Sequence, residues 1–142
     1  MIVFCDTSAL MKLYAAEVHS DWTRHQVKAA SHCVVSQITW VEMCAAFALK
    51  QRTQQVSASE SKSALKRLHT EWPIYVRTGL DVAPMSMAGE LALRFGLRAY
   101  DSVQLASAHH AHAHMGHAMY FCCFDKQLNA AAKNLAIPLL QP

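Results

Sequence analysis

The stretch Ile2-Val3-Phe4-Cys5-Asp6 decides the fold, together with a later stretch of the same kind, Met119-Tyr120-Phe121-Cys122-Cys123-Phe124-Asp125. In both stretches a short apolar run typical of a buried strand ends on an aspartate, and a helix-like pattern follows. If the two runs are strands of one parallel sheet, the two carboxylates meet at its carboxyl edge, where open α/β sheets bind their ligands. Two anions brought together need a cation between them, so the arrangement suggests a metal site.

The rest of the chain alternates between strand-like and helix-like segments. Strands are expected at residues 2–5, 33–35 and 119–124, with short or irregular ones at 74–76 and 137–140. Helices are expected at residues 8–16, 20–30, 37–51, 58–72, 84–95, 101–112 and 126–135. Ser36 is a plausible N-cap, Ser57 and Glu60 have the form of a capping box, and Gly96 stands where a helix should end. The alternation predicts an α/β fold with a parallel sheet covered on both faces, as one domain over residues 1–142.

Composition limits the class of protein. Of 142 residues 53% are hydrophobic and 16% charged, which argues against disorder. No apolar run is long enough for a bilayer, and Met1 to Asp6 lack the basic start of a signal peptide. The five cysteines form no C-x-x-C pair and fit small buried thiols in a reducing compartment. We therefore expect a soluble cytoplasmic protein without a membrane partner, whose net charge of +3 permits a polyanionic one.

Four acidic residues stand out by their apolar surroundings. Besides Asp6 and Asp125, Glu42 lies on the helix face of Ile38, Ala45 and Leu49, and Asp101 opens a largely apolar helix. The alternative for the three aspartates is helix capping, and for Glu42 it is a buried salt bridge, with Lys12 or Arg98 as partner.

Clustered carboxylates without supporting His or Cys select hard cations, so Mg²⁺ or Mn²⁺ is expected over Zn²⁺. Such an ion neutralises a phosphoryl oxygen and makes water a better nucleophile, which phosphodiester hydrolysis needs. In-line attack by water would leave 5′-phosphate and 3′-hydroxyl ends.

Four motifs in order give the chain a resemblance to PIN-domain proteins, specifically to VapC-type toxin ribonucleases. The motifs are residues 3–14 (VFCDTSALMKLY), 38–42 (ITWVE), 96–106 (GLRAYDSVQLA) and 124–132 (FDKQLNAAA). Each is short, but together they span nearly the whole chain at family-like spacing.

The resemblance implies a three-layer α/β/α fold with a central parallel sheet of four to five short strands. It implies that Asp6, Glu42, Asp101 and Asp125 form an acidic pocket for Mg²⁺ or Mn²⁺, with Asp6 and Asp101 touching the ion and the other two acting partly through water. It further implies endonucleolytic cleavage of RNA, a cognate VapB-like antitoxin that blocks the site, and a homodimer. Ser8 could orient water or a phosphate.

Three basic residues lie within a turn or two of a proposed ligand, and they are expected to meet RNA phosphates: Lys12, Arg98 and Lys126. The alternative for each is ordinary pairing with acids or solvent. No aromatic platform for single strands is visible, and Trp22, Trp40 and Trp72 fit core or interface positions.

One segment departs from the family pattern, residues 109–117 (HHAHAHMGH). His110 and His114 are spaced i, i+4 and could hold a soft or borderline metal, although no third ligand is evident. The alternative is a solvated helix end with imidazoles near the negative end of the helix dipole.

Two other functions stay open from sequence alone. The first is a catalytically silent PIN-fold binding module for a protein partner. The second is a metal-dependent phosphatase, which no Asp-x-Asp nucleophile motif supports.

Overall fold

Five short segments pair into one parallel sheet in the computed structural model, which describes residues 1–142 apart from the side chain of Val82. The strands are β1 (Ile2–Cys5), β2 (His32–Ser36), β3 (Val76–Thr78), β4 (Met119–Cys122) and β5 (Leu139–Leu140). Their order across the sheet is β3-β2-β1-β4-β5, and every pairing is parallel. The predicted α/β class and the parallel sheet are confirmed.

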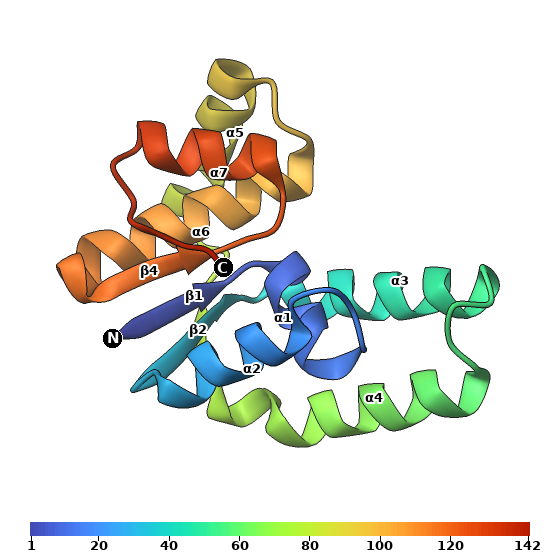
Figure 1. Cartoon of the computed structure of the whole chain (residues 1–142). Coiled ribbons are helices and arrows are strands. Elements are labelled where there is room, and N and C mark those ends of the chain that lie inside the picture. Colours follow the sequence, from blue (N-terminus) through green and yellow to red (C-terminus); the bar gives the residue numbers. More distant parts are fainter.

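Seven α-helices cover the two faces of the sheet (Figure 1). They are α1 (Thr7–Tyr14), α2 (Ser20–Ala29), α3 (Ile38–Arg52), α4 (Ala58–Glu71), α5 (Val82–Phe95), α6 (Ala99–Met115) and α7 (Lys126–Asn134). Short 3₁₀ turns, η1 (Trp72–Ile74) and η2 (Gly116–Ala118), follow α4 and α6.

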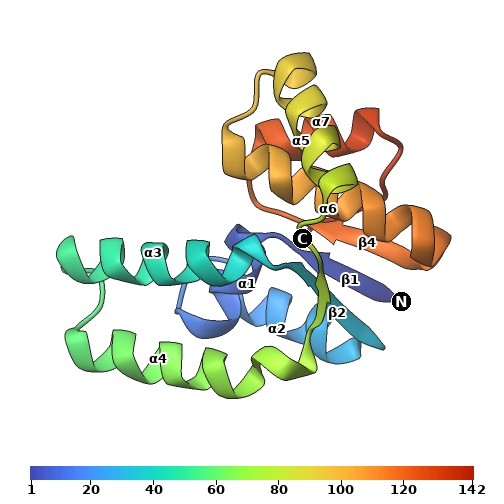
Figure 2. The same ribbon diagram turned by 180° about the vertical axis from the view of Figure 1, so that it is seen from behind.

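The two central strands, β1 and β4, are apolar along their whole length because both faces of the sheet are covered there, as is usual for parallel sheets. Phe4 and Phe121 belong to the core formed with α5, α6 and α7. Their neighbours Val3, Cys5 and Cys122 belong to the opposite core, formed with α1, α3 and α4. The result is a three-layer α/β/α arrangement, and Figure 2 shows α3 and α4 running side by side beyond the sheet.

The winding of the chain changes direction between β1 and β4. From β1 the chain builds outward through β2 to β3 on one side, and β4 and β5 occupy the other side. The helices that follow these two central strands, α1 and α7, therefore pack on opposite faces of the sheet. The crevice between such strands is the usual ligand site of an open α/β sheet.

Most expected helix ends are close to the observed ones. The capping box of Ser57 and Glu60 is present, α4 ends before Pro73, and α5 ends at Gly96, which has a left-handed φ of 64°. Ser36 is wrong as an N-cap, because it is the last residue of β2 and Gln37 occupies the cap position.

All five cysteines are free thiols, in agreement with the sequence interpretation. Among the described residues, no helix combines the length and the apolar character needed to cross a bilayer.

Candidate active site

Asp6 is a buried carboxylate at the end of β1. Asp6 is only 5% exposed. Its Oδ1 caps α1 by accepting hydrogen bonds from the Ala9 amide (3.0 Å) and the Ser8 hydroxyl (2.7 Å). Burial raises the pKa of Asp6 to about 6, although hydrogen bonds from Ser8, Ala9 and Cys123 act to lower it. Within the described part of the chain, no ion pair involves this carboxylate. A buried anion without a cation is costly, so the site favours binding a positive charge.

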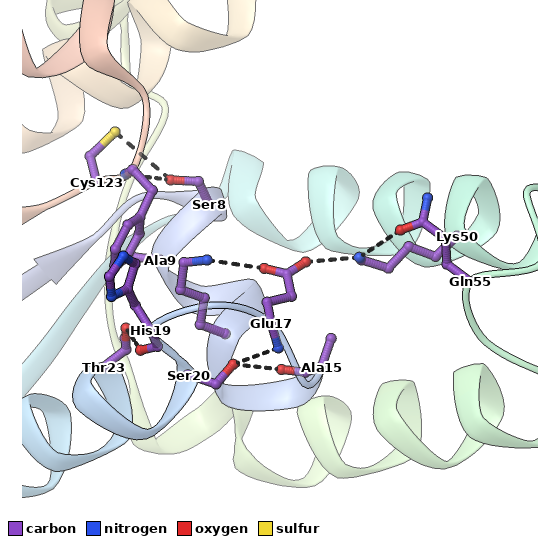
Figure 3. A network of polar contacts seen from close by, with 12 residues as sticks. Ser8, Ala9, Ala15, Glu17, His19, Ser20, Thr23, Lys50, Gln55 and Cys123 are labelled. Carbon is purple, nitrogen blue, oxygen red and sulfur yellow. Dashed lines mark hydrogen bonds and ion pairs between the residues drawn. The ribbon is translucent and has the colours of Figure 1, made fainter.

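The loop after β4 is joined to Asp6 through Ser8 and Cys123. The Ser8 hydroxyl accepts a hydrogen bond from the Phe124 amide at 2.9 Å while donating to Asp6. The Cys123 thiol lies 3.2 Å from the Asp6 Oδ2, and burial, reinforced by that carboxylate, raises the pKa of the thiol so that it stays a donor. Figure 3 shows Ser8 and Cys123 side by side between the two segments. Asp125 follows in this loop and caps α7 by accepting from the Leu128 amide at 2.8 Å.

Glu42 is held by neutral donors from two other helices. Its Oε1 accepts from the Thr7 hydroxyl at 2.9 Å and from the Gln104 amide nitrogen at 2.8 Å. Gln104 is 1% exposed, and the same nitrogen lies 3.0 Å from the Thr7 hydroxyl and 2.8 Å from the Thr39 hydroxyl. If the Gln104 amide were flipped, its Oε1 would face the Glu42 Oε1, and two acceptors would repel each other. Glu42 therefore fixes the orientation of the Gln104 amide. The Gln104 Oε1 is left buried without a partner among the described residues.

Glu42 and Asp101 line the same pocket of ≈270 Å³, whose other residues are Arg98, Ala99 and Tyr100. Asp101 pairs with the Arg98 Nε at 3.1 Å. Because the Arg98 side chain is 85% exposed, this ion pair is weak and is open to exchange with a ligand.

The structure brings the four predicted acids together only in part: Glu42 and Asp101 line one pocket, whereas Asp6 and Asp125 follow the adjacent strands β1 and β4. Two expectations about these acids were wrong. Glu42 is not on a buried stripe: the buried face of α3 consists of Thr39, Met43 and Phe47, and Leu49 is 49% exposed. Helix α6 begins two residues earlier than expected, so Asp101 lies in its first turn and does not cap it.

The capping alternative is correct for Asp6 and Asp125 as a description of local structure. The salt-bridge alternative for Glu42 is wrong, since its partners are Thr7 and Gln104. Sequence reasoning missed Gln104, although a polar residue one turn after Asp101 in an otherwise apolar helix was a usable signal.

The basic residues near the site differ in accessibility. Lys126 is exposed at the start of α7. Lys12 is buried, with its Nζ 3.3 Å from the Glu17 Oε2 and 4.4 Å from the centre of the Phe124 ring. The other oxygen of Glu17 binds Lys50 at 2.8 Å, as Figure 3 shows. A phosphate could reach Lys12 only by displacing Glu17.

The donor set fits a hard divalent cation, because the pocket offers carboxylate oxygens and the buried Asp6 has no counter-charge. In the described part of the chain, however, no three side chains of His, Cys, Asp or Glu lie close enough together to hold a metal. An ion bound without rearrangement would have at most two of these carboxylates as direct ligands and water at its other positions, as Mg²⁺ often has.

Comparison with known proteins identifies the fold and the family that the four sequence motifs resemble. The PIN domain family model matches residues 3–134 of the chain. Ribonuclease VapC46 of Mycobacterium tuberculosis is 26% identical over 140 residues, which cover 99% of this chain and 97% of that protein.

Two solved structures illustrate the likeness of fold. VapC20 of Mycobacterium tuberculosis, described as a sarcin–ricin loop cleaving toxin, superposes with a TM-score of 0.66 at 15% identity, over 91% of this chain and 94% of that one. A toxin–antitoxin complex from Klebsiella pneumoniae gives a TM-score of 0.59 at 15% identity, over 87% and 86% of the two chains. The resemblance read from the four motifs is confirmed.

The raised pKa of Asp6 predicts how stability depends on pH without metal. Folding moves this pKa from 3.8 to about 6, so the folded protein binds the proton more tightly and loses stability as pH rises through that range. Two pKa units correspond to roughly 3 kcal/mol. Asp6→Asn removes the titration and keeps a capping side chain, so we expect it to gain stability relative to the wild type between pH 4 and pH 7. Urea unfolding in EDTA measures this, with the exposed Asp21→Asn as control; a difference independent of pH would contradict it.

The contacts of Gln104 predict a separation of metal affinity from stability. Gln104→Met keeps the volume, removes the orphaned oxygen and deprives Glu42 of a donor. We expect Mn²⁺ to bind about tenfold more weakly, the usual cost of losing a residue that orients a ligand, while the midpoint of unfolding changes little. Calorimetric titration with Mn²⁺ tests this, with the exposed Gln127→Met as a matched control. Unchanged affinity in Gln104→Met would show that Glu42 does not depend on this amide.

Proposed function

This chain belongs to the PIN domain family, and on that premise we propose that it is a Mg²⁺- or Mn²⁺-dependent endoribonuclease, the toxin of a toxin–antitoxin pair. The observation that carries the proposal is the buried Asp6 carboxylate, which has no ion-pair partner among the described residues and lies next in sequence to Thr7, a donor to Glu42. The similarity to ribonuclease VapC46 supports RNA as the substrate.

We assign the four acids to the metal and the hydrolytic step. Asp6 and Asp101 would bind the ion directly, and Glu42 and Asp125 would complete its surroundings partly through water. A bound Mg²⁺ or Mn²⁺ supplies Lewis-acid stabilisation of the phosphoryl oxygens and increases the acidity of water. Thr7 and Gln104 keep the Glu42 carboxylate aimed into the pocket, and Ser8 holds Asp6 against the loop of Asp125.

The basic residues guide the RNA backbone. Arg98 is exposed at the pocket mouth, and we infer that it exchanges its contact with Asp101 for a phosphate when RNA binds. Lys126, exposed beside Asp125, contacts a neighbouring phosphate, and Lys12 does so once Glu17 releases it. RNA as substrate places the protein in the cytoplasm, where its five free thiols stay reduced.

The decisive experiment is cleavage of single-stranded RNA in Mn²⁺. We expect Asp6→Asn and Asp101→Asn to lower the rate by at least about 10²–10³-fold, the usual scale for losing a group that stabilises the transition state. Asp21→Asn, which removes an exposed carboxylate on α2, should cleave like the wild type. EDTA should stop the reaction, and the products should carry 5′-phosphate and 3′-hydroxyl ends. Circular dichroism establishes that the inactive variants are folded.

Two results would point to a different function. Protein that binds a partner tightly yet leaves every RNA uncut would be a PIN-fold binding module. Release of inorganic phosphate from a chromogenic ester, without RNA cleavage, would indicate a phosphatase. Cleavage by Asp6→Asn at the wild-type rate would exclude our site assignment, whatever the substrate.

We place the antitoxin in a pocket of ≈650 Å³ between the end of α1, α3 and α4. Val56 and Ala64 supply apolar surface there, and Lys50 and Arg67 outnumber Glu60 among the charged residues of the lining. This lining suits a peptide segment with apolar and acidic side chains. The toxin–antitoxin complex among the structural neighbours supports a protein partner of this kind. A homodimer would cover apolar side chains exposed elsewhere, such as Leu93 at 90% and Ile74 at 79%.

Filling this pocket should uncouple neutralisation from toxicity. Ser63 lines the pocket and is exposed, so Ser63→Trp should fill it without disturbing the core. When expressed, the variant should arrest growth as the wild type does, but co-expression of the cognate antitoxin should no longer rescue it. Lys66→Trp, also exposed on α4 but outside the pocket lining, should still be rescued. If the antitoxin rescued cells that express Ser63→Trp, this pocket would not be its binding site.

A further inference from the structure

The last turns of α6 carry a histidine cluster that the proposed nuclease does not use. Between residues 102 and 118 the chain has no Asp, Glu, Lys or Arg, so imidazoles are the only basic side chains in this segment. Five of them fall in this segment: His109, His110, His112, His114 and His117. At about 1.5 Å per residue, His114 lies about 20 Å along the helix from Asp101, so the cluster is separate from the acidic edge.

Two of these side chains already face one another. His110 and His114 are both exposed, and their ring centres are 4.3 Å apart with the ring planes inclined by 46°. The His114 Nδ1 lies 2.8 Å from the carbonyl oxygen of His110. A carbonyl only accepts, so Nδ1 carries the proton and Nε2 presents its lone pair. Histidines that bind metals are commonly oriented by such a hydrogen bond from the other ring nitrogen.

The ring separation matches chelation of one ion. A metal–nitrogen bond of about 2.0–2.1 Å plus roughly 1.1 Å to the ring centre places each ring about 3.2 Å from the metal. Two nitrogens in adjacent positions of an octahedral or square-planar ion would then have ring centres about 4.5 Å apart. The observed 4.3 Å needs only a small ring rotation to reach this arrangement.

In the part of the chain that the structure describes, the other histidines of this segment do not form a second pair of this kind. The rings of His112 and His117 are 6.1 Å apart, and the His112 Nδ1 is buried without a partner among the described residues. With two protein nitrogens, an ion at His110 and His114 keeps water or another ligand at its remaining positions. The negative end of the α6 dipole lies at this turn and favours a cation there.

We propose that His110 and His114 form a binding site for a borderline divalent ion of the Ni²⁺, Cu²⁺ and Zn²⁺ class. Mg²⁺ and Mn²⁺ do not compete for it, because imidazole nitrogens suit the borderline ions and Mg²⁺ takes oxygen ligands. The chain would then bind two kinds of metal at opposite ends of α6. The site does not depend on the proposed nuclease activity.

Calorimetric titration of the full chain with Ni²⁺ in excess Mg²⁺ tests the site. We expect one saturable ion per chain, and an affinity about 100-fold lower in His110→Ala and in His114→Ala, since each loses the effective concentration of the second nitrogen. His109→Ala and His117→Ala are matched controls in the same segment and should bind like the wild type. Ni²⁺ should also raise the melting temperature of the wild type and of both control variants, but not that of His110→Ala or His114→Ala.

His110→Ala is the cleaner variant, because the ring of His114 is the one that also bonds to the backbone. Circular dichroism checks that α6 is intact in both. Wild-type affinity in His110→Ala, an equal loss in His117→Ala, or no saturable binding by the wild type would each overturn the proposal.

Discussion

A carboxylate buried without a counter-charge imposes the main constraint on this molecule. Asp6 lies where the winding of the sheet reverses, so the segments after β1 and β4 lead to helices on opposite faces of the sheet. The hydrogen bonds from Ser8, Ala9 and Cys123 orient the carboxylate but bring no positive charge. The protein has therefore given up stability at this position, which is common at functional sites and uncommon in ordinary cores.

The surroundings preserve negative charge where a ligand would need it. Glu42 is oriented by a hydroxyl and an amide, which leave its full charge in place, whereas a lysine or arginine would have neutralised it. Asp101 does have a cation, but that arginine is mostly in solvent and its attraction is screened. The groups that donate hydrogen bonds to Glu42 are neutral, and the positively charged Arg98 lies at the mouth of the pocket. This order suits a centre that must accept a positive ion first and a phosphate afterwards.

Local sequence patterns were enough to predict the sheet, the helices and the aspartates that follow two of its strands, because strand and helix periodicities and capping act over a few residues. They failed for the environment of Glu42. Helix periodicity alone placed Glu42 on a buried stripe with Leu49, but the direction in which α3 faces the core is set by its packing against α4 and α6, which no local pattern records. Gln104 was missed for a related reason, since its partners Thr7 and Thr39 are 97 and 65 residues away.

The thiol of Cys123 and the carboxylate of Asp6 are 117 residues apart in the chain. The ribosome makes β1 first among the strands. β1 can pair with β4, and Asp6 can meet the loop after β4, only after every helix between the two strands has been made. A growing chain therefore contains Asp6, Glu42 and Asp101 but lacks β4, Cys123 and Asp125, so it cannot complete the site. If the finished protein cuts RNA, the ribosome that makes it is shielded from the product for most of translation by the order in which the strands are made.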